Sequence, residues 1–121
     1  MAHQGPVSPP TSIVYTVERW APGIYREFWD AIVQGVSAPV FITSYWRDPG
    51  TNRLVGGHPD SQHLVGLGLD LQYADRSAAL ADVSRFASLG LVAVDEGTHV
   101  HIQAWPAGVA RSSGLLRAVG V

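Results

Sequence analysis

Side chains with metal-binding chemistry gather in two short stretches of the chain. His63 and Asp70 lie on either side of a turn at Gly66, and His99 and His101 alternate along a later stretch with the pattern of a β-strand. A catalytic zinc ion takes three protein ligands, usually imidazoles and a carboxylate, and leaves a fourth position for water. Each of these residues alone also fits a buried structural role or a surface role. Their co-location on neighbouring strands favours a zinc site made of His63, Asp70 and one of the two later histidines.

Strand alternation decides which way these side chains face. Over residues 67–72 the leucines share one face, and Asp70 shares the other with neighbouring glycines. Over residues 98–104 valine and isoleucine share one face, and His99 and His101 share the other. The glycines are expected to keep the Asp70 face open, as a metal ion with a substrate on it requires.

The rest of the pattern predicts an α+β fold, with a small antiparallel sheet of about four strands and flanking helices. Runs of β-branched and apolar residues predict strands at residues 40–44, 67–72, 91–94 and 98–104. Apolar residues at helical spacing predict helices at residues 22–35 and 75–90, and a short closing helix in the tail. In the second helix, Asp75 or Ser77 is the expected N-cap. Its expected apolar stripe consists of Leu80, Val83, Phe86, Ala87 and Leu89.

Two segments lack this regular pattern. Residues 1–12 contain several prolines and are expected to form an irregular N-terminal arm, in which His3 has no site role. Residues 13–15 are expected to form an edge strand or a docking segment, at the start of a single domain over residues 13–121. Residues 45–60 are rich in Gly, Pro, Asn and Asp and predict a long loop, which in a compact domain is usually functional.

Composition narrows the classes of function. The 121 residues carry a net charge of −2, with 46 % apolar and 15 % charged residues, which is typical of one globular domain. This charge favours neither nucleic acid nor a membrane surface as a partner, and we expect a monomer. The chain has no cysteine, so it has neither disulfides nor thiolate metal ligands. We see neither a signal peptide nor an apolar run of membrane-spanning length, so we expect synthesis in the cytoplasm.

A longer motif surrounds the first histidine and the aspartate. It consists of Thr43-Ser44-Tyr45-Trp46-Arg47, Asn52, Gly56-Gly57 and Ser61-Gln62-His63-Leu64-Val65-Gly66-Leu67-Gly68-Leu69-Asp70. With the later histidine strand, this part of the chain, roughly residues 40–104, resembles the peptidase M15 family. These are zinc D-alanyl-D-alanine carboxypeptidases and related peptidoglycan endopeptidases with the Hedgehog/DD-peptidase fold. The family pattern is Ser-x-His-x-x-Gly-x-Ala-x-Asp, and Gly68 stands in place of the alanine, a departure that we expect to be sterically benign.

The resemblance implies roles for individual residues. His63 and Asp70 would be zinc ligands, and His101 fits best as the third ligand because apolar residues flank it, as in the family's strand pattern. A guanidinium suits a substrate carboxylate, which is the role implied for Arg47. Ser61 would orient the His63 loop or contact the substrate. The residues assigned to substrate binding are Arg47, Ser61 and Asn52.

Two hypotheses remain open for the general base. Many family members carry an acid three residues before the last ligand histidine. Counted from His101 that position is Thr98, and counted from His99 it is Glu96. In the first hypothesis His101 binds zinc, and Glu96 or Asp95 acts as base. His99 then assists. In the second hypothesis His99 binds zinc with Glu96 as base, and His101 is auxiliary.

The resemblance implies a zinc-dependent metallopeptidase that cleaves peptidoglycan stem peptides with a zinc-activated water. D-Ala-D-Ala carboxypeptidase and L-Ala-D-Glu endopeptidase activities are both compatible with it. The alternatives are a catalytically inactive zinc-binding module for cell-wall or protein interaction, and a metal-free interaction domain. Without a signal peptide, the expected setting is a phage lysin or a virion-associated enzyme that acts on the cell wall.

Overall fold

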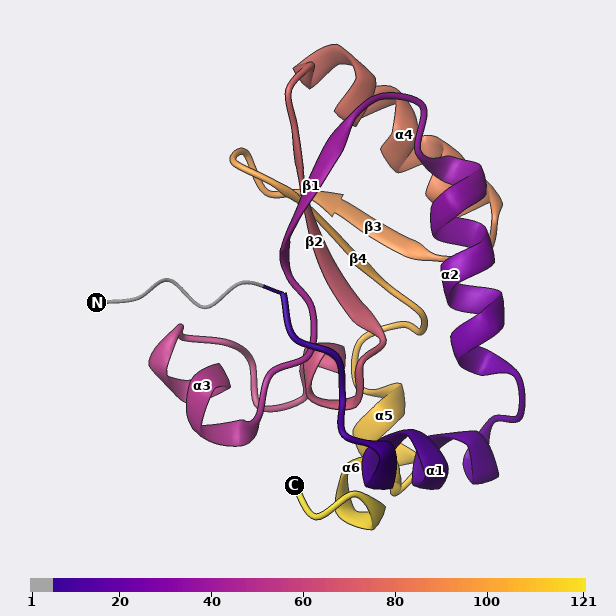
Figure 1. Cartoon of the computed structure of the whole chain (residues 1–121), viewed down its shortest axis with the longest axis vertical. Coiled ribbons are helices and arrows are strands. Elements are labelled where there is room, and N and C mark those ends of the chain that lie inside the picture. Colours follow the sequence, from indigo (N-terminus) through magenta and orange to yellow (C-terminus); the bar gives the residue numbers. More distant parts are fainter. Residues whose placement is uncertain (1–5) are drawn as a thin grey trace.

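A four-stranded antiparallel sheet is the centre of the structure, a computed structural model that describes residues 6–121 (Figure 1). Its strands are β1 (Val40–Ser44), β2 (Gly68–Tyr73), β3 (Val92–Asp95) and β4 (Val100–Gln103). Their order is β1-β2-β4-β3, so the strands that carry Asp70 and His101 are neighbours in the middle of the sheet. The predicted α+β fold with a small antiparallel sheet is confirmed.

Two helices cover the apolar face of this sheet. In Figure 1, α2 (Ile24–Gly35) and α4 (Arg76–Ser88) lie on the same side of the strands. The central strands contribute fully buried side chains to the core, with relative exposures of 0–1 %: Leu69, Leu71, Val100 and Ile102. Phe28 from α2 and Phe86 from α4 belong to the same core cluster. Since each large apolar side chain contributes about 1.5–3 kcal/mol when it is fully buried, this face holds the sheet and helices together.

Helix α4 begins where the sequence predicts, and its buried face matches the predicted stripe only in part. Asp75 is its N-cap and accepts two backbone N–H groups of the first turn, which confirms one of the two predicted caps. Leu80 was expected in the apolar stripe, and this is wrong because its side chain is 60 % exposed. Phe86 is buried as predicted, and Val83 and Leu89 pack against the core. The buried face also carries Ala79 and a polar residue, Asp82, which has hydrogen-bond partners of its own.

The N-terminal segment is helical earlier than predicted. Helix α1 (Thr11–Trp20) follows Pro10 without interruption and buries Val17. The edge strand expected at residues 13–15 is therefore wrong, because so short an apolar run does not distinguish a strand from one turn of a helix. The helix also begins inside the arm expected over residues 1–12, whose first five residues, including His3, lie outside the described part.

Short helices occupy segments that were expected to be a loop or one tail helix. They are α3 (Pro49–Leu54), the 3-10 helix η1 (Gln62–Val65), α5 (Val109–Ser112) and α6 (Leu115–Ala118). Helix α3 lies inside the predicted loop, where Asp48 caps it by accepting the N–H of Thr51 at 2.7 Å. The tail forms two helices because Gly114 adopts a φ of +82° between them. None of the helices in residues 6–121 is both long and apolar enough to cross a membrane.

Candidate metal centre

The polar face of the sheet carries a row of side chains that crosses the strands. Asp70 on β2 lies opposite Ser44 on β1 and opposite His101 on β4. His101 in turn lies opposite Val94 on β3. Directly opposed residues point to the same face. The register of β1 with β2 shifts between Ile42 and Ser44. Irregularities of this kind commonly redirect a side chain next to a functional site.

The turn η1 brings His63 onto this row from outside the sheet. Ser61 caps the turn by accepting the backbone N–H of His63 at 3.2 Å, which is the orienting role expected of it. Gly66 ends the turn with a φ of +72°, a conformation that favours glycine. The turn then packs so closely on β2 that a Cβ on Gly68 would lie 2.7 Å from the backbone nitrogen of His63. Gly68 therefore allows η1 to pack closely on β2, and it does not serve to keep the Asp70 face open. An alanine at position 68 would clash with the backbone of this turn, so the departure from the family pattern is not sterically benign.

Donor atoms of three residues meet on this face. His63 Nε2 lies 3.2 Å from Asp70 Oδ1, and His101 Nδ1 lies 3.0 Å from the same oxygen. The three ligand atoms all lie within 4.8 Å of one another. His63 and Asp70 are 2 % and 6 % exposed, and the side chain of His101 is 18 % exposed. The cluster is thus sheltered from solvent, with His101 as its most accessible member.

In each ligand imidazole, one nitrogen faces Asp70 and the other makes a hydrogen bond elsewhere in the protein. This second bond decides which nitrogen carries the proton and which carries a lone pair. His63 Nδ1 lies 2.5 Å from the carbonyl oxygen of Tyr45, which can only accept, so this nitrogen is the donor. His101 Nε2 lies 2.8 Å from Gln103 Oε1 and donates to it. In the neutral rings, both nitrogens that face Asp70 Oδ1 therefore carry lone pairs. Such an arrangement is repulsive unless a proton or a metal cation lies between the nitrogen and the carboxylate.

Neighbouring groups keep the Asp70 carboxylate ionised. Burial alone would raise its pKa, but hydrogen bonds and charge interactions with His101 and His63 outweigh burial and hold the pKa below its ordinary value. Arg47 adds an ion pair, with Nη2 3.2 Å from Asp70 Oδ2. For His101, burial would lower the pKa, and the hydrogen bonds to Asp70 and Gln103 raise it overall. Asp70 is therefore an anion at neutral pH, as a carboxylate metal ligand must be.

The donor spacing is suited to zinc. Ligand atoms about 2.0–2.2 Å from a tetrahedral centre lie roughly 3.3–3.6 Å from one another. The separations of 3.0 and 3.2 Å between Asp70 Oδ1 and the two imidazole nitrogens are close to these values. Two imidazoles and one carboxylate are also a common donor set of catalytic zinc. The residue types and these two separations therefore fit this metal, with all three ligand atoms within 4.8 Å of one another.

The candidates for the general base lie in different places. His99 Nε2 lies 3.9 Å from Asp70 Oδ2 and 3.5 Å from Glu96 Oε1, at the edge of the cluster. Glu96 is in the turn between β3 and β4, and its side chain is 48 % exposed. The register turns Asp95 to the opposite face of the sheet, where Arg76 donates a hydrogen bond to its carboxylate and lowers its pKa. The structure thus brings Glu96 and His99 towards the cluster and leaves Asp95 away from it.

The residues predicted to bind substrate have protein partners. Arg47 donates to Ser44 Oγ at 3.1 Å and to Asn52 Oδ1 at 3.4 Å, in addition to its ion pair with Asp70. Asn52 is only 3 % exposed, and its Nδ2 donates to the carbonyl of His58 at 3.0 Å. Asn52 is therefore a buried residue that holds Arg47 and the backbone at His58 in place, whereas Arg47 contacts the cluster itself through Asp70.

Sequence reasoning missed the groups that hold the two imidazoles from outside. The carbonyl of Tyr45 left no signal, because every residue supplies a backbone carbonyl. Gln103 did leave one, since it lies two positions beyond His101 on the same polar face of the predicted strand. Its contact with the ring became visible only in the structure.

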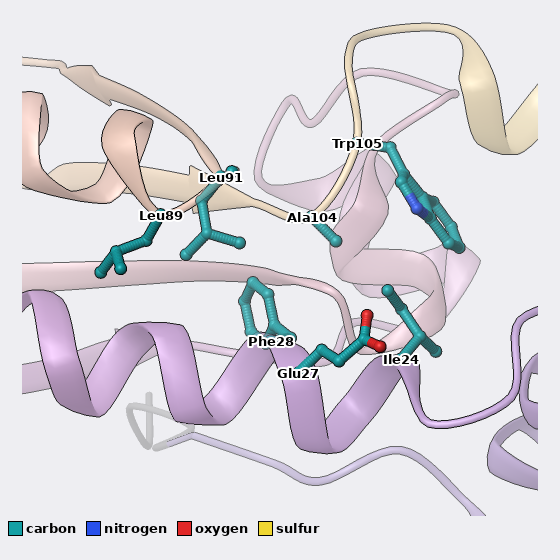
Figure 2. A pocket seen from close by; sticks show the side chains of 8 residues that line it. Ile24, Glu27, Phe28, Leu89, Leu91, Ala104 and Trp105 are labelled. Carbon is teal, nitrogen blue, oxygen red and sulfur yellow. The ribbon is translucent and has the colours of Figure 1, made fainter.

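Two hollows lie near this region. One, of about 370 Å³, lies beside the cluster and is lined by His58, Asp60, Ser61, Gln103, Ala107 and Gly108. The other, of about 240 Å³, lies against α2, where Figure 2 shows Phe28, Trp105 and Glu27 around it. None of the candidate ligands lines either hollow. We associate the first one with the metal centre because two of its lining residues contact ligands: Ser61 accepts the backbone N–H of His63, and Gln103 lies 2.8 Å from His101 Nε2.

The whole cluster falls within a region that matches a known family. The family described as Peptidase M15 matches residues 15–103, which is most of the chain. The chain belongs to the peptidase M15 family. The resemblance found in the sequence motif is therefore confirmed, and the M15 match spans all the site residues discussed above. No curated protein and no solved structure matches the chain.

Proposed function

We propose that this M15-family chain is a zinc-dependent metallopeptidase that cleaves peptide bonds in peptidoglycan stem peptides. The observation that carries the proposal is the convergence of two imidazole nitrogens on one carboxylate oxygen, in the cluster of His63, Asp70 and His101. Membership of a peptidase family supports the same class of reaction. Both a D-Ala-D-Ala carboxypeptidase and an L-Ala-D-Glu type endopeptidase fall within the proposal.

His63 Nε2, Asp70 Oδ1 and His101 Nδ1 would hold the zinc ion. Zinc bound there would polarise the scissile carbonyl and lower the pKa of a water molecule, so that a hydroxide-like nucleophile exists near neutral pH. The chain's own residues supply orientation. The carbonyl of Tyr45 and the amide of Gln103 each fix the outer nitrogen of a ligand ring, so that the inner nitrogen already faces Asp70.

Glu96 is the proposed general base, with His99 between it and the cluster. The distances of 3.5 Å from His99 Nε2 to Glu96 Oε1 and 3.9 Å to Asp70 Oδ2 support this arrangement. Contacts of this kind are commonly long before substrate binds and shorten in the complex. The same distances favour His101 as the third ligand and His99 as the auxiliary residue, which is the first of the two hypotheses.

Arg47 and the hollow beside Gln103 are the proposed substrate contacts. Each guanidinium nitrogen of Arg47 makes one hydrogen bond within the protein, which leaves further N–H groups for a substrate carboxylate. The hollow, with Ser61 and Gln103 in its wall, offers room for part of a peptide substrate. We further propose that the enzyme acts on the cell wall as a monomer, as a phage lysin or a virion-associated peptidase.

Digestion of purified peptidoglycan tests the proposal. With zinc present, the wild-type chain is expected to release D-Ala or to expose new amino termini, both detected by mass spectrometry. Glu96→Gln should retain zinc and lose about 10²–10⁴-fold in rate, the usual contribution of a general base. The matched variant Asp95→Asn should keep the rate, because Asp95 is bonded to Arg76 on the other face. If the zinc-loaded wild type cleaves nothing, the peptidase proposal is refuted.

A zinc-binding module without catalysis is the second candidate. Two observations favour it: Thr98 stands where many M15 members carry an acid before the ligand His101, and the Glu96 side chain is 48 % exposed. This candidate predicts one zinc ion per chain, no cleavage, and equal binding of peptidoglycan by the wild type and by Glu96→Gln. Elemental analysis of protein purified without chelator, followed by a sedimentation assay with insoluble peptidoglycan, separates it from the peptidase.

A further inference from the structure

Gln103 connects the metal centre to the loop that follows β4. Its Oε1 lies 2.8 Å from His101 Nε2, and its Nε2 donates to the carbonyl of Trp105 at 2.8 Å. The register places Gln103 opposite Gly68, on the same face as the row formed by Asp70 and His101. Both ends of the side-chain amide are therefore engaged on the polar face.

The Trp105 peptide leaves the Gln103 amide a single orientation. A carbonyl oxygen can only accept, so Gln103 must direct its NH2 group at Trp105 and its oxygen at His101. Gln62 binds the backbone of the same residue: it donates to the Trp105 carbonyl at 2.6 Å and accepts the Trp105 N–H at 2.9 Å. Because Gln62 is only 2 % exposed, water does not compete for these bonds.

We propose that Gln103 is a positioning residue of the metal centre, an inference that rests on the proposed zinc site. Its amide oxygen accepts a hydrogen bond from His101 Nε2–H, and this leaves the lone pair of Nδ1 directed at the metal. A half-turn of the imidazole about its Cβ–Cγ bond would break this hydrogen bond, so Gln103 resists it. The network also extends through Trp105 to Gln62, the residue before His63. Two glutamines and the backbone of Trp105 thus hold the two ligand histidines at a set spacing.

Two substitutions at this position separate the role towards the metal from a role in the loop. Gln103→Leu keeps a side chain of similar size but removes the acceptor for His101 Nε2–H. Gln103→Glu keeps an acceptor oxygen for His101 and loses the donor to Trp105. Gln72→Leu is the matched control, because Gln72 lies two positions beyond Asp70 on neighbouring β2 and is exposed. Mutating the hydrogen-bond partner of a ligand imidazole typically lowers metal affinity by about 10- to 100-fold.

Zinc affinity of the full chain, measured by competition with a chromogenic chelator, provides the first readout. Gln103→Leu is expected to bind zinc about 10- to 100-fold more weakly than the wild type. Gln103→Glu is expected to recover most of this loss, and Gln72→Leu to match the wild type. The second readout is the ¹⁵N spectrum of the imidazoles in zinc-loaded protein. A slowly exchanging Nε2 proton of His101 is expected in the wild type and in Gln103→Glu, and not in Gln103→Leu.

The outcomes distinguish this inference from the proposed function. If the wild type binds one zinc ion and Gln103→Leu binds it within about twofold with the Nε2 proton retained, the positioning role is overturned and the zinc site stands. If Gln103→Leu and Gln103→Glu weaken zinc binding equally, the positioning role is also overturned. The loss would then come from the hydrogen bond to the Trp105 carbonyl and not from the one to His101. A wild type that binds no zinc overturns the metal centre itself, and the positioning role with it.

Discussion

Replacing Gly68 with alanine is expected to weaken both the fold and the metal centre. The new Cβ would lie 2.7 Å from the backbone nitrogen of His63 and 3.0 Å from the carbonyl carbon of Gln62. Both atoms belong to the backbone of η1, so no flexible side chain can move aside. The chain must relieve the contact by displacing the turn that carries His63 away from β2.

The size of the displacement follows from these distances. Ordinary van der Waals contact begins near 3.4 Å, so the turn must move by about 0.7 Å. Overpacking of this kind typically costs about 1–3 kcal/mol in the free energy of unfolding. For a chain of 121 residues this corresponds to a fall in Tm of roughly 4–15 °C. A metal site tolerates about 0.5 Å of misplacement, so we expect zinc affinity to fall by at least about tenfold.

Thermal unfolding followed by circular dichroism, and zinc competition with a chelator, measure the two effects. Gly50→Ala, inside α3, is the matched control, because its Cβ would meet only side-chain atoms, Asp48 Oδ1 at 3.3 Å and Arg53 Nη2 at 3.9 Å. Alanine is favoured over glycine within a helix, so this control should leave Tm unchanged or raise it. A Gly68→Ala protein with wild-type Tm and wild-type zinc affinity would refute the close approach of η1 to β2.

Two further predictions concern acid stability and the metal. Asp82 is fully buried and accepts hydrogen bonds from Ser37 and Tyr73. Burial alone would raise its pKa, but these bonds and the charge of Arg85 lower it overall. The ionised form therefore stabilises the fold above the unfolded-state pKa of about 3.9, and this stability is lost as pH falls through the lower folded-state pKa. Asp82→Asn should cost about 1–3 kcal/mol at pH 7 and flatten the acid side of the stability profile in urea titrations; an unchanged profile would contradict this. Zinc at about 100 times its Kd should stabilise the wild type by about 2.7 kcal/mol, seen as a higher Tm that EDTA reverses, and Asp70→Asn should largely lose the shift.

Local patterns in the sequence were enough to predict the strands and to limit the cap of α4 to Asp75 or Ser77. Alternation placed the leucines of β2 on the core face, and Asp75 caps the helix because its carboxylate satisfies free backbone N–H groups. The edge strand offered as one alternative for residues 13–15 was wrong because a short apolar run fits a strand or a helical turn equally well. Leu80 was assigned wrongly because the buried position of Asp82 depends on partners from β2 and the α2–β1 loop.

The candidate site shows the same division between local and distant information. The histidines and the aspartate were found from residue type and motif spacing, since a zinc site needs these donors whatever surrounds them. Gly68 was misjudged because its neighbour is the backbone of η1, which the chain brings back against β2. Asp95 and Glu96 are adjacent in the sequence, and only strand register shows that Asp95 turns to the opposite face.

The sequence by itself determined the family, the α+β fold and the set of residues from which a metal site can be built. These follow from spacing along the chain, which secondary structure converts directly into faces. The tertiary structure alone decided that His101 joins His63 and Asp70 while His99 lies at the edge, and which nitrogen of each ring faces the carboxylate. These features depend on the hydrogen bonds that His63 donates to the Tyr45 carbonyl and His101 donates to Gln103, and on the register of β2 with β4. The Tyr45 contact and the strand register join segments far apart in the chain, so no local pattern encodes them.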